Sequence, residues 1–331
     1  MTISAWCRTT RANKNRWSNI AKKTALPSSR ISDGPEPWNF RLVFTLSVKT
    51  EQRMPLVNNR FFHRAWHQLC RQWPFIRGRD RLMRISSGNE GIRSSIMRLP
   101  EWVQTRENFA MRVSRDFDYT SFLLRLFGDL EPATKQFFLS NMKDGEAFLD
   151  VGANVGYFGL LIAKMFPRSP VVAFEPNPSI ADCLQDSMRC NGMEGRMTVA
   201  RHAVSFENGS LPFVVEGNNS GHSRLATDTS GSQVIDVETV IFDEWVKSHP
   251  IGERVACMKM DVEGAEVMAL RGMRELLKRD RPALCVEGYD NQLREFGSSL
   301  QELKQLLADA GYREVAPCDG NLYLKHKSTL G

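Results

Sequence analysis

Residues 148–158 read FLDVGANVGYF, and this stretch decides the fold. An apolar run ends at Asp150, two glycines follow at positions 152 and 156, and residues 160–166 form a second apolar run. Glycine allows the backbone to turn tightly and to come close to a ligand. The stretch therefore predicts a β-strand, a glycine turn and an α-helix next to a bound molecule.

Glu175 indicates what the turn binds. It lies nineteen positions after Gly156, at the end of the apolar run 171–174. An acid about 20 residues after such a turn, at the end of the next strand, holds ribose hydroxyls. The turn lacks the middle glycine of G-x-G-x-x-G, because Asn154 occupies that place, and no G-x-x-x-x-G-K-[ST] follows. We therefore expect a nucleoside without a pyrophosphate, and S-adenosylmethionine fits.

Strands alternate with helices along the rest of the chain. This alternation predicts an α/β fold with a doubly wound, mostly parallel sheet that is covered on both faces. The predicted helices are 131–142, 180–190, 265–278 and 300–310. The predicted strands are 197–200, 255–261 and 282–287, short strands with a turn within 101–122, a hairpin-like pair at 211–216 and 234–240, and a terminal antiparallel pair at 312–316 and 321–325.

Four acids stand at the ends of predicted strands. Ligands of parallel sheets bind beyond the carboxyl ends of the strands. We therefore expect all four acids to line one rim of the sheet. They are Asp150, Glu175, Asp261 and Glu287.

The second motif is KMDVEGAE, residues 259–266. Its carboxylates at Asp261, Glu263 and Glu266 are costly to place together, because like charges raise one another's pKa. Their functional interpretations are a general base, metal ligands or a contact to the methionyl ammonium of the cofactor. Capping of a helix N-terminus explains one of the three. It hardly explains Asp261, which we expect to lie on the strand.

These motifs resemble those of one family. The segments D-V-G-A-N-x-G-x-[FY], F-E-P-x-P and K-x-D-V-E-G-A-E, with L-R-G at 270–272 and G-D-L-E-P at 128–132, are similar to FkbM-type S-adenosylmethionine-dependent methyltransferases. The resemblance covers about residues 115–325. It implies a Rossmann-like class I methyltransferase fold with seven strands and an antiparallel terminal strand. It also implies O-methylation of a hydroxyl on a sugar, a glycolipid or a natural product.

The resemblance implies site residues as well. Glu175 would hold the ribose, and Asn177 would help to hold the adenosine. Ala203 would contact the adenine side, with His202 beside it. Asp261 would face the transferred methyl group and belong to the cofactor site. The cofactor loop would consist of Asp150, Gly152, Ala153, Asn154, Gly156 and Tyr157.

Methylation of a hydroxyl needs a base that removes its proton, which contributes about 10²–10⁴-fold. Asp261 is the first choice and Glu263 the second. A Mg²⁺ ion held by Asp261 and Glu287 would act instead by lowering the pKa of the hydroxyl. His63 and His67 are spaced like a metal pair, but no third ligand stands near them, so no metal site is predicted there. The candidate catalytic residues are Asp261, Glu263, Glu287 and His202.

Charge divides the chain unevenly. Residues 1–100 contain 19 Lys and Arg against 5 Asp and Glu, a net charge of +14, whereas the remainder has a net charge of −8. The basic start is interpreted as a solvated tail, with an arm for an anionic partner, a transit peptide or a true start at Met54 as alternatives. A basic amphipathic helix is expected at 61–74. The predicted segments are a basic, disordered extension at 1–55, a helical or irregular lead-in at 56–115 and the methyltransferase domain at 116–328.

Composition bounds the location and the partners. The apolar run 42–48 is too short to span a bilayer, so no stable membrane insertion is expected. Seven scattered cysteines without a C-x-x-C pair predict reduced thiols and a cytoplasmic protein. The expected acceptor is a hydroxyl of a small molecule or glycan. One alternative is an RNA methyltransferase that uses the basic N-terminal region, although the chain lacks an N-P-P-Y-type motif. Another is a non-catalytic binding protein with the same fold.

Overall fold

The computed structural model describes residues 60–72, 79–115, 118–215, 224–225, 233–318 and 320–329. The expected basic extension at 1–55 lies outside this part of the chain. The chain divides into two compact units, Met1–Trp66 and His67–Gly331, and the second contains the sheet and the candidate site. The predicted amphipathic helix is present as α3, Arg60–Gln72.

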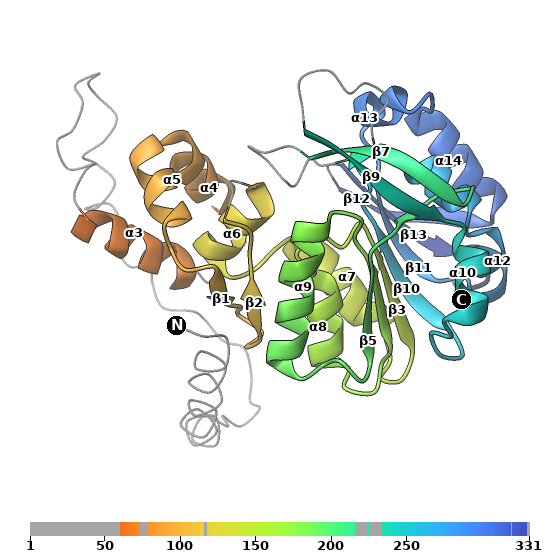
Figure 1. The fold of residues 1–331 in the computed structure, drawn as a ribbon, viewed down its shortest axis with the longest axis horizontal. Coiled ribbons are helices and arrows are strands. Elements are labelled where there is room, and N and C mark those ends of the chain that lie inside the picture. Colours follow the sequence, from red (N-terminus) through yellow and green to blue (C-terminus); the bar gives the residue numbers. More distant parts are fainter. Residues whose placement is uncertain are drawn as a thin grey trace, which may run out of the picture. The chain divides into compact units, whose positions relative to one another are not determined.

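One seven-stranded sheet forms the centre of the second unit (Figure 1). Strands β3, β4, β5, β10 and β11 run parallel, and β13 runs antiparallel between β11 and β12. The predicted doubly wound, mostly parallel sheet with an antiparallel terminal strand is thus confirmed. In spatial order the strands are β12 (Tyr312–Cys318), β13 (Asn321–His326), β11 (Ala283–Glu287), β10 (Val255–Met260), β3 (Ala147–Val151), β4 (Val171–Phe174) and β5 (Met197–Ala200).

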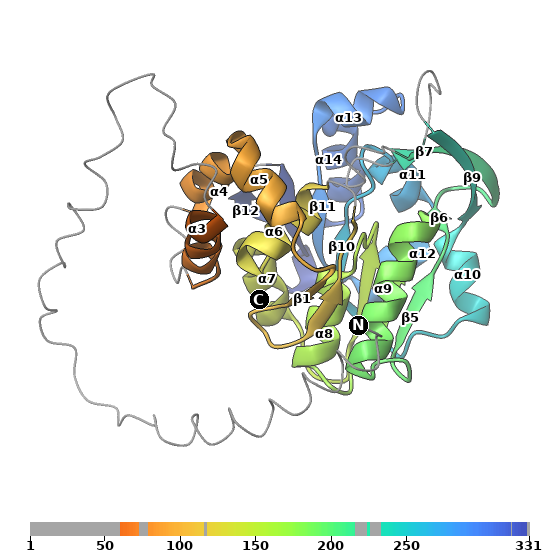
Figure 2. The ribbon, with the colours of Figure 1, turned by 60° about the vertical axis from the view of Figure 1, so that its left-hand side comes forward.

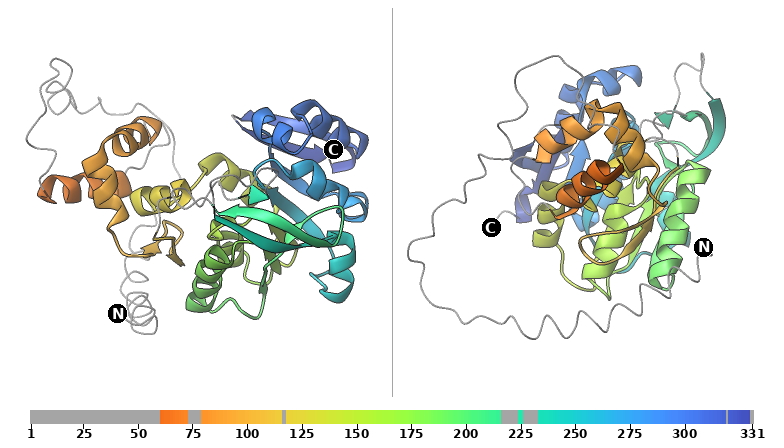
Figure 3. Two further views of the ribbon diagram at one scale, coloured as in Figure 1. Left: turned by 45° about the horizontal axis from the view of Figure 1, so that its top comes forward. Right: turned by 90° about the vertical axis from the view of Figure 1, so that its left-hand side faces the viewer.

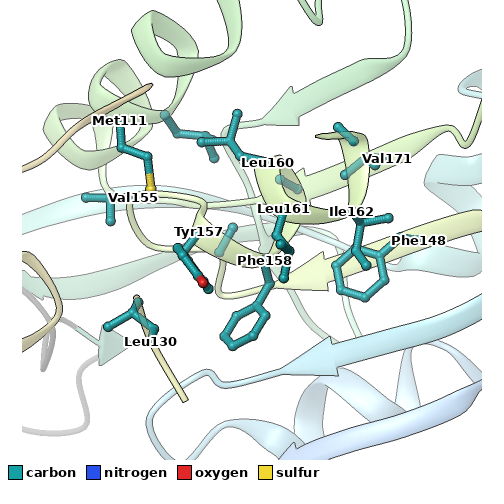
Figure 4. Packing of buried hydrophobic residues seen from close by; sticks show 14 of the residues in the cluster. Met111, Leu130, Phe148, Val155, Tyr157, Phe158, Leu160, Leu161, Ile162 and Val171 are labelled. Carbon is teal, nitrogen blue, oxygen red and sulfur yellow. The ribbon is translucent and has the colours of Figure 1, made fainter. Parts of the chain in front are cut away.

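Alternate residues of the central strands face two separate apolar layers. Phe148 and Ala173 join the layer that α7, α8 and α9 cover, whereas Leu149 and Val172 join the layer of α10, α11, α12 and α14. Helices α8 and α9 lie side by side in Figures 1 and 2, and Figure 4 shows the packing of α8. The helices are α7 (Pro132–Asn141), α8 (Tyr157–Met165), α9 (Pro178–Asn191), α10 (Phe242–Ser248), α11 (Glu266–Arg271), α12 (Arg274–Asp280) and α14 (Leu300–Asp309).

A second sheet of four strands follows β5 in the chain. The predicted hairpin-like pair is confirmed as β7 and β9, which pair antiparallel and are drawn in green in Figure 3. Strand β8 pairs with β7, and β6 pairs with β9. The bounds are β6 (Ala203–Val204), β7 (Gly209–Val215), β8 (Arg224–Leu225) and β9 (Gln233–Val240).

The lead-in contains helices as well as the predicted short strands. The expectation of strands and a turn over 101–122 is right for β1 and β2 and wrong for the start of α6. Asp118 begins α6 by accepting a hydrogen bond from Ser121 N at 2.6 Å, and Gly128 ends it in a left-handed conformation. Both are ordinary helix-capping signals. The elements are α4 (Arg79–Gly88), α5 (Glu90–Met97), β1 (Trp102–Gln104), β2 (Ala110–Arg112) and α6 (Tyr119–Phe127).

The single helix predicted at 265–278 is two helices, α11 and α12. Gly272 separates them, and a Cβ at this position would lie 2.0 Å from the carbonyl oxygen of Ser205. The carbonyl oxygen of Gly272 also accepts a hydrogen bond from Asp243 N at 3.1 Å. Contacts with distant segments therefore break the helix, and periodicity does not report them. Helix α13 (Asp290–Glu295) was not predicted either.

Two findings bear on the expectations from composition. Among the described residues, no helix is both long enough and apolar enough to cross a membrane. In the described part of the chain, four cysteines are free and buried, as expected of reduced thiols; they are Cys70, Cys183, Cys257 and Cys285. Cys190 is disulfide-bonded, which contradicts the prediction that all thiols are reduced.

Candidate active site

A cavity of about 720 Å³ lies at the carboxyl ends of the parallel strands. Its wall contains the loop after β3 and residues that follow β4, β5, β10 and β11. This is the edge at which open α/β sheets bind ligands, and the volume suits a nucleoside-sized molecule. The predicted site residues in the wall are Gly152, Ala153, Asn154, Tyr157, Glu175, His202, Ala203, Asp261, Glu263 and Glu287.

The glycine loop is held in a conformation that few residues adopt. Gly152, Asn154 and Gly156 all have positive φ, at 77°, 51° and 81°. A Cβ on Gly152 would lie 1.8 Å from the carbonyl oxygen of Asp261, so the loop packs directly against the end of β10. Asparagine tolerates this region better than most residues, and its Oδ1 accepts a hydrogen bond from Val155 N at 2.7 Å. The sequence pattern thus predicts the loop correctly.

Three predicted cofactor residues do not line the cavity. Asp150 is 1% exposed and lies below the loop, where its Oδ2 accepts a hydrogen bond from Gly159 N at 3.0 Å. Burial raises its pKa to about 6. Gly156 packs against Leu184 instead. Asn177 is buried and caps α9. The expectation that Asp150 lines the rim is therefore wrong, since its side chain points into the layer below α8.

Glu175 holds the loop and faces the cavity. It is 7% exposed, and its two oxygens accept hydrogen bonds from Asn154 N at 2.8 Å and from Asn177 N at 2.9 Å. Burial raises its pKa to about 7, against the opposing effect of the two backbone N–H groups. A carboxylate has room for further hydrogen bonds. Glu175 can therefore accept hydrogen bonds from ligand hydroxyls at the end of β4.

His202 and Ala203 follow β5 and form a different part of the wall. His202 Nε2 lies 3.2 Å from Glu238 Oε2, on the exposed side chain of a β9 residue. This contact ties His202 to the second sheet. The position of His202 therefore suits contact with a ligand. It suits the role of a general base at the acid cluster less well.

Asp261, Glu263 and Glu287 form a compact acid cluster. One carboxylate oxygen from each lies within 4.8 Å of the others. Burial, followed by the charges of Asp261 and Glu263, raises the pKa of Glu287 to about 11. Glu287 therefore keeps its proton at neutral pH and can donate a hydrogen bond, whereas a general base must be free to accept one.

Glu266 is the remaining acid of the KMDVEGAE motif. It has the capping role that was expected for one of the three carboxylates in that motif. Glu266 is 1% exposed, and its Oε1 accepts hydrogen bonds from Val262 N at 3.1 Å and from Gly264 N at 3.2 Å. It stabilises the turn that presents Asp261 to the cavity. Strand β10 ends at Met260, so Asp261 lies just beyond the strand and not on it.

Lys259 and Glu131 are charged residues of the wall that were not predicted as site residues. Lys259 is 6% exposed, and its Nζ lies 2.6 Å from Asp261 Oδ2 and 5.5 Å from the ring centre of Phe158. Glu131, in the G-D-L-E-P segment, also lines the cavity. The signal for Lys259 was its position two residues before Asp261, because alternate strand residues face the same side.

Segments outside the main sheet complete the wall. Asp80 and Met83 come from α4, and Tyr119 comes from α6. Phe213 and Leu225 come from the second sheet. The lead-in and the second sheet therefore shape the part of the cavity that the central strands do not.

Asp129 connects the lead-in to the cofactor loop. Its carboxylate, 5% exposed, accepts hydrogen bonds from Arg79 Nη1 at 2.9 Å, Lys135 Nζ at 2.8 Å and Tyr157 Oη at 2.8 Å. Arg79 also lies over the ring of Phe127, 4.4 Å from its centre. Tyr157 begins α8 directly after the glycine loop. One buried carboxylate thus joins α4, α7 and α8.

The fold and the cavity together define a class I methyltransferase domain. Residues 150–314 match the family model for the methyltransferase FkbM domain. The predicted resemblance is confirmed.

Several curated relatives are methyltransferases by name. Methyltransferase sdnD of Sordaria araneosa is 26% identical over 165 residues, which are 41% of this chain and 64% of sdnD. The 2-O-methyltransferase NoeI of Sinorhizobium fredii is 28% identical over 182 residues, 50% of this chain and 72% of NoeI. Hexuronic acid methyltransferase AglP of Haloferax volcanii is 29% identical over 142 residues, 42% of this chain and 55% of AglP. The chain thus spans less than two thirds of sdnD and of AglP.

Among solved structures, a methyltransferase FkbM from Methylobacillus flagellatus is similar with a TM-score of 0.40 and 17% identity. The similarity covers 75% of this chain and 60% of that one.

Proposed function

We propose that this protein is an S-adenosylmethionine-dependent O-methyltransferase that acts on a hydroxyl of a sugar, a glycolipid or a natural product. One observation carries the proposal: Glu175, the glycine loop and Asp261 all line one cavity at the carboxyl ends of the strands. Two of the curated relatives are named for a 2-O-methyl transfer and for a hexuronic acid substrate.

The residues in the wall fit the cofactor. Glu175 offers carboxylate oxygens for two ribose hydroxyls. Ala203 and Ile180 offer apolar contacts on the side of β5, where an adenine ring would lie. Gly152 brings the backbone close to the ligand without a side chain in the way. When bound, the cofactor supplies a methyl group that is already activated on a sulfonium.

The chain's own task is to orient the acceptor hydroxyl and to remove its proton. Asp261 is the residue that we propose as the base. Lys259 Nζ lies 2.6 Å from Asp261 Oδ2 and so fixes the carboxylate at the cavity. Burial and the neighbouring charge of Asp261 raise the pKa of Glu287, and a side-chain hydrogen bond joins Glu287 to Asp261. Glu263 is the second candidate base.

Mg²⁺ is the alternative way to lower the pKa of the hydroxyl. Asp261, Glu263 and Glu287 provide the oxygen ligands that this ion prefers. Two features count against it, namely the ammonium group of Lys259 next to Asp261 and the raised pKa of Glu287. Transfer that persists after EDTA treatment would support the metal-free site.

A labelled-methyl transfer assay tests the proposal. The full chain is incubated with S-adenosylmethionine carrying a tritiated methyl group and with glycan, lipid and RNA fractions of a cell extract. We expect label in the glycan or lipid fraction that an ether-cleaving reagent such as hydriodic acid releases and that mild base does not, as expected of a methyl ether. Label confined to RNA would favour the nucleic-acid alternative, and absence of both transfer and cofactor binding would favour a non-catalytic protein.

Glu175 should make cofactor binding dependent on pH. Burial raises its pKa to about 7, and the ionised form accepts hydrogen bonds from the ribose. Affinity should therefore rise with pH through this value, by about tenfold from pH 6 to pH 8 for a single ionisation. Calorimetric titration with S-adenosylhomocysteine at several pH values measures this dependence. Glu175→Gln should bind more weakly and lose most of this pH dependence, and an unchanged profile in that variant would assign the titration to another group.

A further inference from the structure

Glu131 has a strained backbone conformation at the edge of the cavity. It precedes Pro132 at the start of α7, and its φ and ψ are 34° and 71°, in the left-handed region that non-glycine residues rarely adopt. Its side chain makes no capping hydrogen bond to the helix. Strain of this kind persists where the surrounding structure enforces it, and it concentrates at functional sites. The conformation therefore calls for a reason other than helix capping.

Two buried hydroxyl groups orient the Glu131 carboxylate. Thr134 Oγ1 donates a hydrogen bond to Glu131 Oε2 at 2.8 Å, and Tyr323 Oη lies 2.7 Å from the same Thr134 oxygen. Thr134 is 1% exposed, whereas Glu131 itself is exposed and lines the cavity. The carboxylate is thus fixed through one oxygen and can still accept hydrogen bonds from a ligand.

The sheet order places Glu131 at one end of the ligand path. Ala203 follows β5, Glu175 follows β4, and the next strands are β3 and β10. Helix α7 contacts β10 and β11. If the ribose of the cofactor lies at Glu175 and the adenine ring points towards β5, the methionyl tail extends towards β3 and β10. Glu131 and Lys259 line the cavity there.

The pKa of Lys259 also indicates that Glu131 lies near it. Burial lowers the pKa of Lys259, but the charges of Asp261, Glu131 and Asp150 outweigh burial and raise it well above its ordinary value. This end of the cavity is therefore lined by an excess of carboxylates over its one lysine. A ligand group that carries a positive charge would be favoured there.

We propose that Glu131 binds the ammonium group of the cofactor's methionyl tail, an inference that rests on the proposed function. The neighbouring acids are engaged elsewhere. Asp261 Oδ2 lies 2.6 Å from Lys259 Nζ, and Asp261, Glu263 and Glu287 form one compact cluster. Glu175 lies at the ribose. Glu131 is the oriented, accessible carboxylate on the side of the tail.

Two ligands that differ only in the tail separate this role from a structural one. S-adenosylhomocysteine carries the aminobutyrate tail, whereas 5′-methylthioadenosine has the same adenosine and thioether without it. Glu131→Gln should weaken binding of S-adenosylhomocysteine by about 10- to 100-fold, the loss of one hydrogen bond to a charged group. Binding of 5′-methylthioadenosine should not change. Calorimetric titration of the full chain gives both dissociation constants.

Glu302→Gln is the matched control, because it makes the same substitution at an acid outside the cavity wall, where Glu302 pairs with Arg271 at 2.8 Å. It should change neither dissociation constant. Equal weakening of both ligands by Glu131→Gln, or no change in either, would overturn the inference and leave the proposed function intact. A wild-type chain that binds neither ligand would overturn both.

A second variant keeps the test decisive if Glu131→Gln does not fold. Thr134→Val keeps the volume of the side chain and removes the hydroxyl that orients Glu131. Thr134→Val should weaken the binding of S-adenosylhomocysteine but not that of 5′-methylthioadenosine, and by a smaller factor than Glu131→Gln does. Equal effects of Thr134→Val on both ligands would show that the hydroxyl pair supports the fold and not the tail.

Discussion

Replacing Asp261 with asparagine should lower methyl transfer by about 10²–10⁴-fold, the contribution of a positioned general base. Asparagine has the same shape but does not take the proton of a hydroxyl at neutral pH. Lys259 loses a charged partner at 2.6 Å, but the glycine loop and Glu175 keep their own hydrogen bonds. Cofactor affinity should therefore fall far less than turnover. Turnover is measured with the acceptor fraction found in the labelled-methyl assay, and affinity by calorimetry.

Glu263→Gln is the matched comparison for Asp261→Asn. Glu263 belongs to the same acid cluster, and Gln292 Nε2 donates a hydrogen bond to its Oε2. This variant should reduce turnover less than Asp261→Asn does. Unchanged turnover in Asp261→Asn would remove Asp261 as the base, and a larger loss in Glu263→Gln would assign the role to Glu263.

Replacing Asp129 with alanine should lower the free energy of unfolding by about 3–5 kcal/mol, as expected when one member of a buried ion-pair network is removed. Arg79 and Lys135 would keep their charges without the carboxylate, and the Tyr157 hydroxyl would lose a hydrogen bond at 2.8 Å. Equilibrium unfolding in urea measures the change. Glu314→Ala is the control, since its surface pair with Lys304 at 3.4 Å should contribute below about 1 kcal/mol.

The Asp129 contribution should also depend on pH. Burial raises the pKa of Asp129, but its hydrogen bond and ion pair with Lys135 outweigh this and hold the pKa below its ordinary value of 3.8. The stabilisation is therefore fully present above pH 3.8 and is lost as the pH falls through the folded-state pKa. An equal loss of stability for Asp129→Ala and Glu314→Ala would contradict the role of the network.

The parts of the site that could be predicted are those that local sequence encodes. The glycines at 152 and 156 have the positive φ that their spacing indicates, and Glu175 stands at the end of a strand as the spacing requires. The mostly parallel sheet could be predicted because apolar runs typical of strands alternate with segments of helical periodicity. These features depend on backbone conformation and period, which neighbouring residues determine.

The parts that were missed depend on contacts between distant segments. Asp150 stands one residue before the end of β3, and the pleat turns its side chain towards α8 and away from the cavity. Lys259 and Glu131 line the same cavity because α7 packs on β10. The break at Gly272 comes from Ser205. No local pattern contains these contacts, so a single sequence does not reveal them.

The Asp129 network also determines where the chain can be cut. The family match begins at residue 150, yet Asp129 and two of its partners, Arg79 and Lys135, precede that position. A recombinant fragment that starts at residue 150 would lack α7 and most of β3, and it would uncover the ring of Phe158 on which Phe138 packs. The matched segment is therefore shorter than the packed unit, and a fragment that keeps this network should begin before α4.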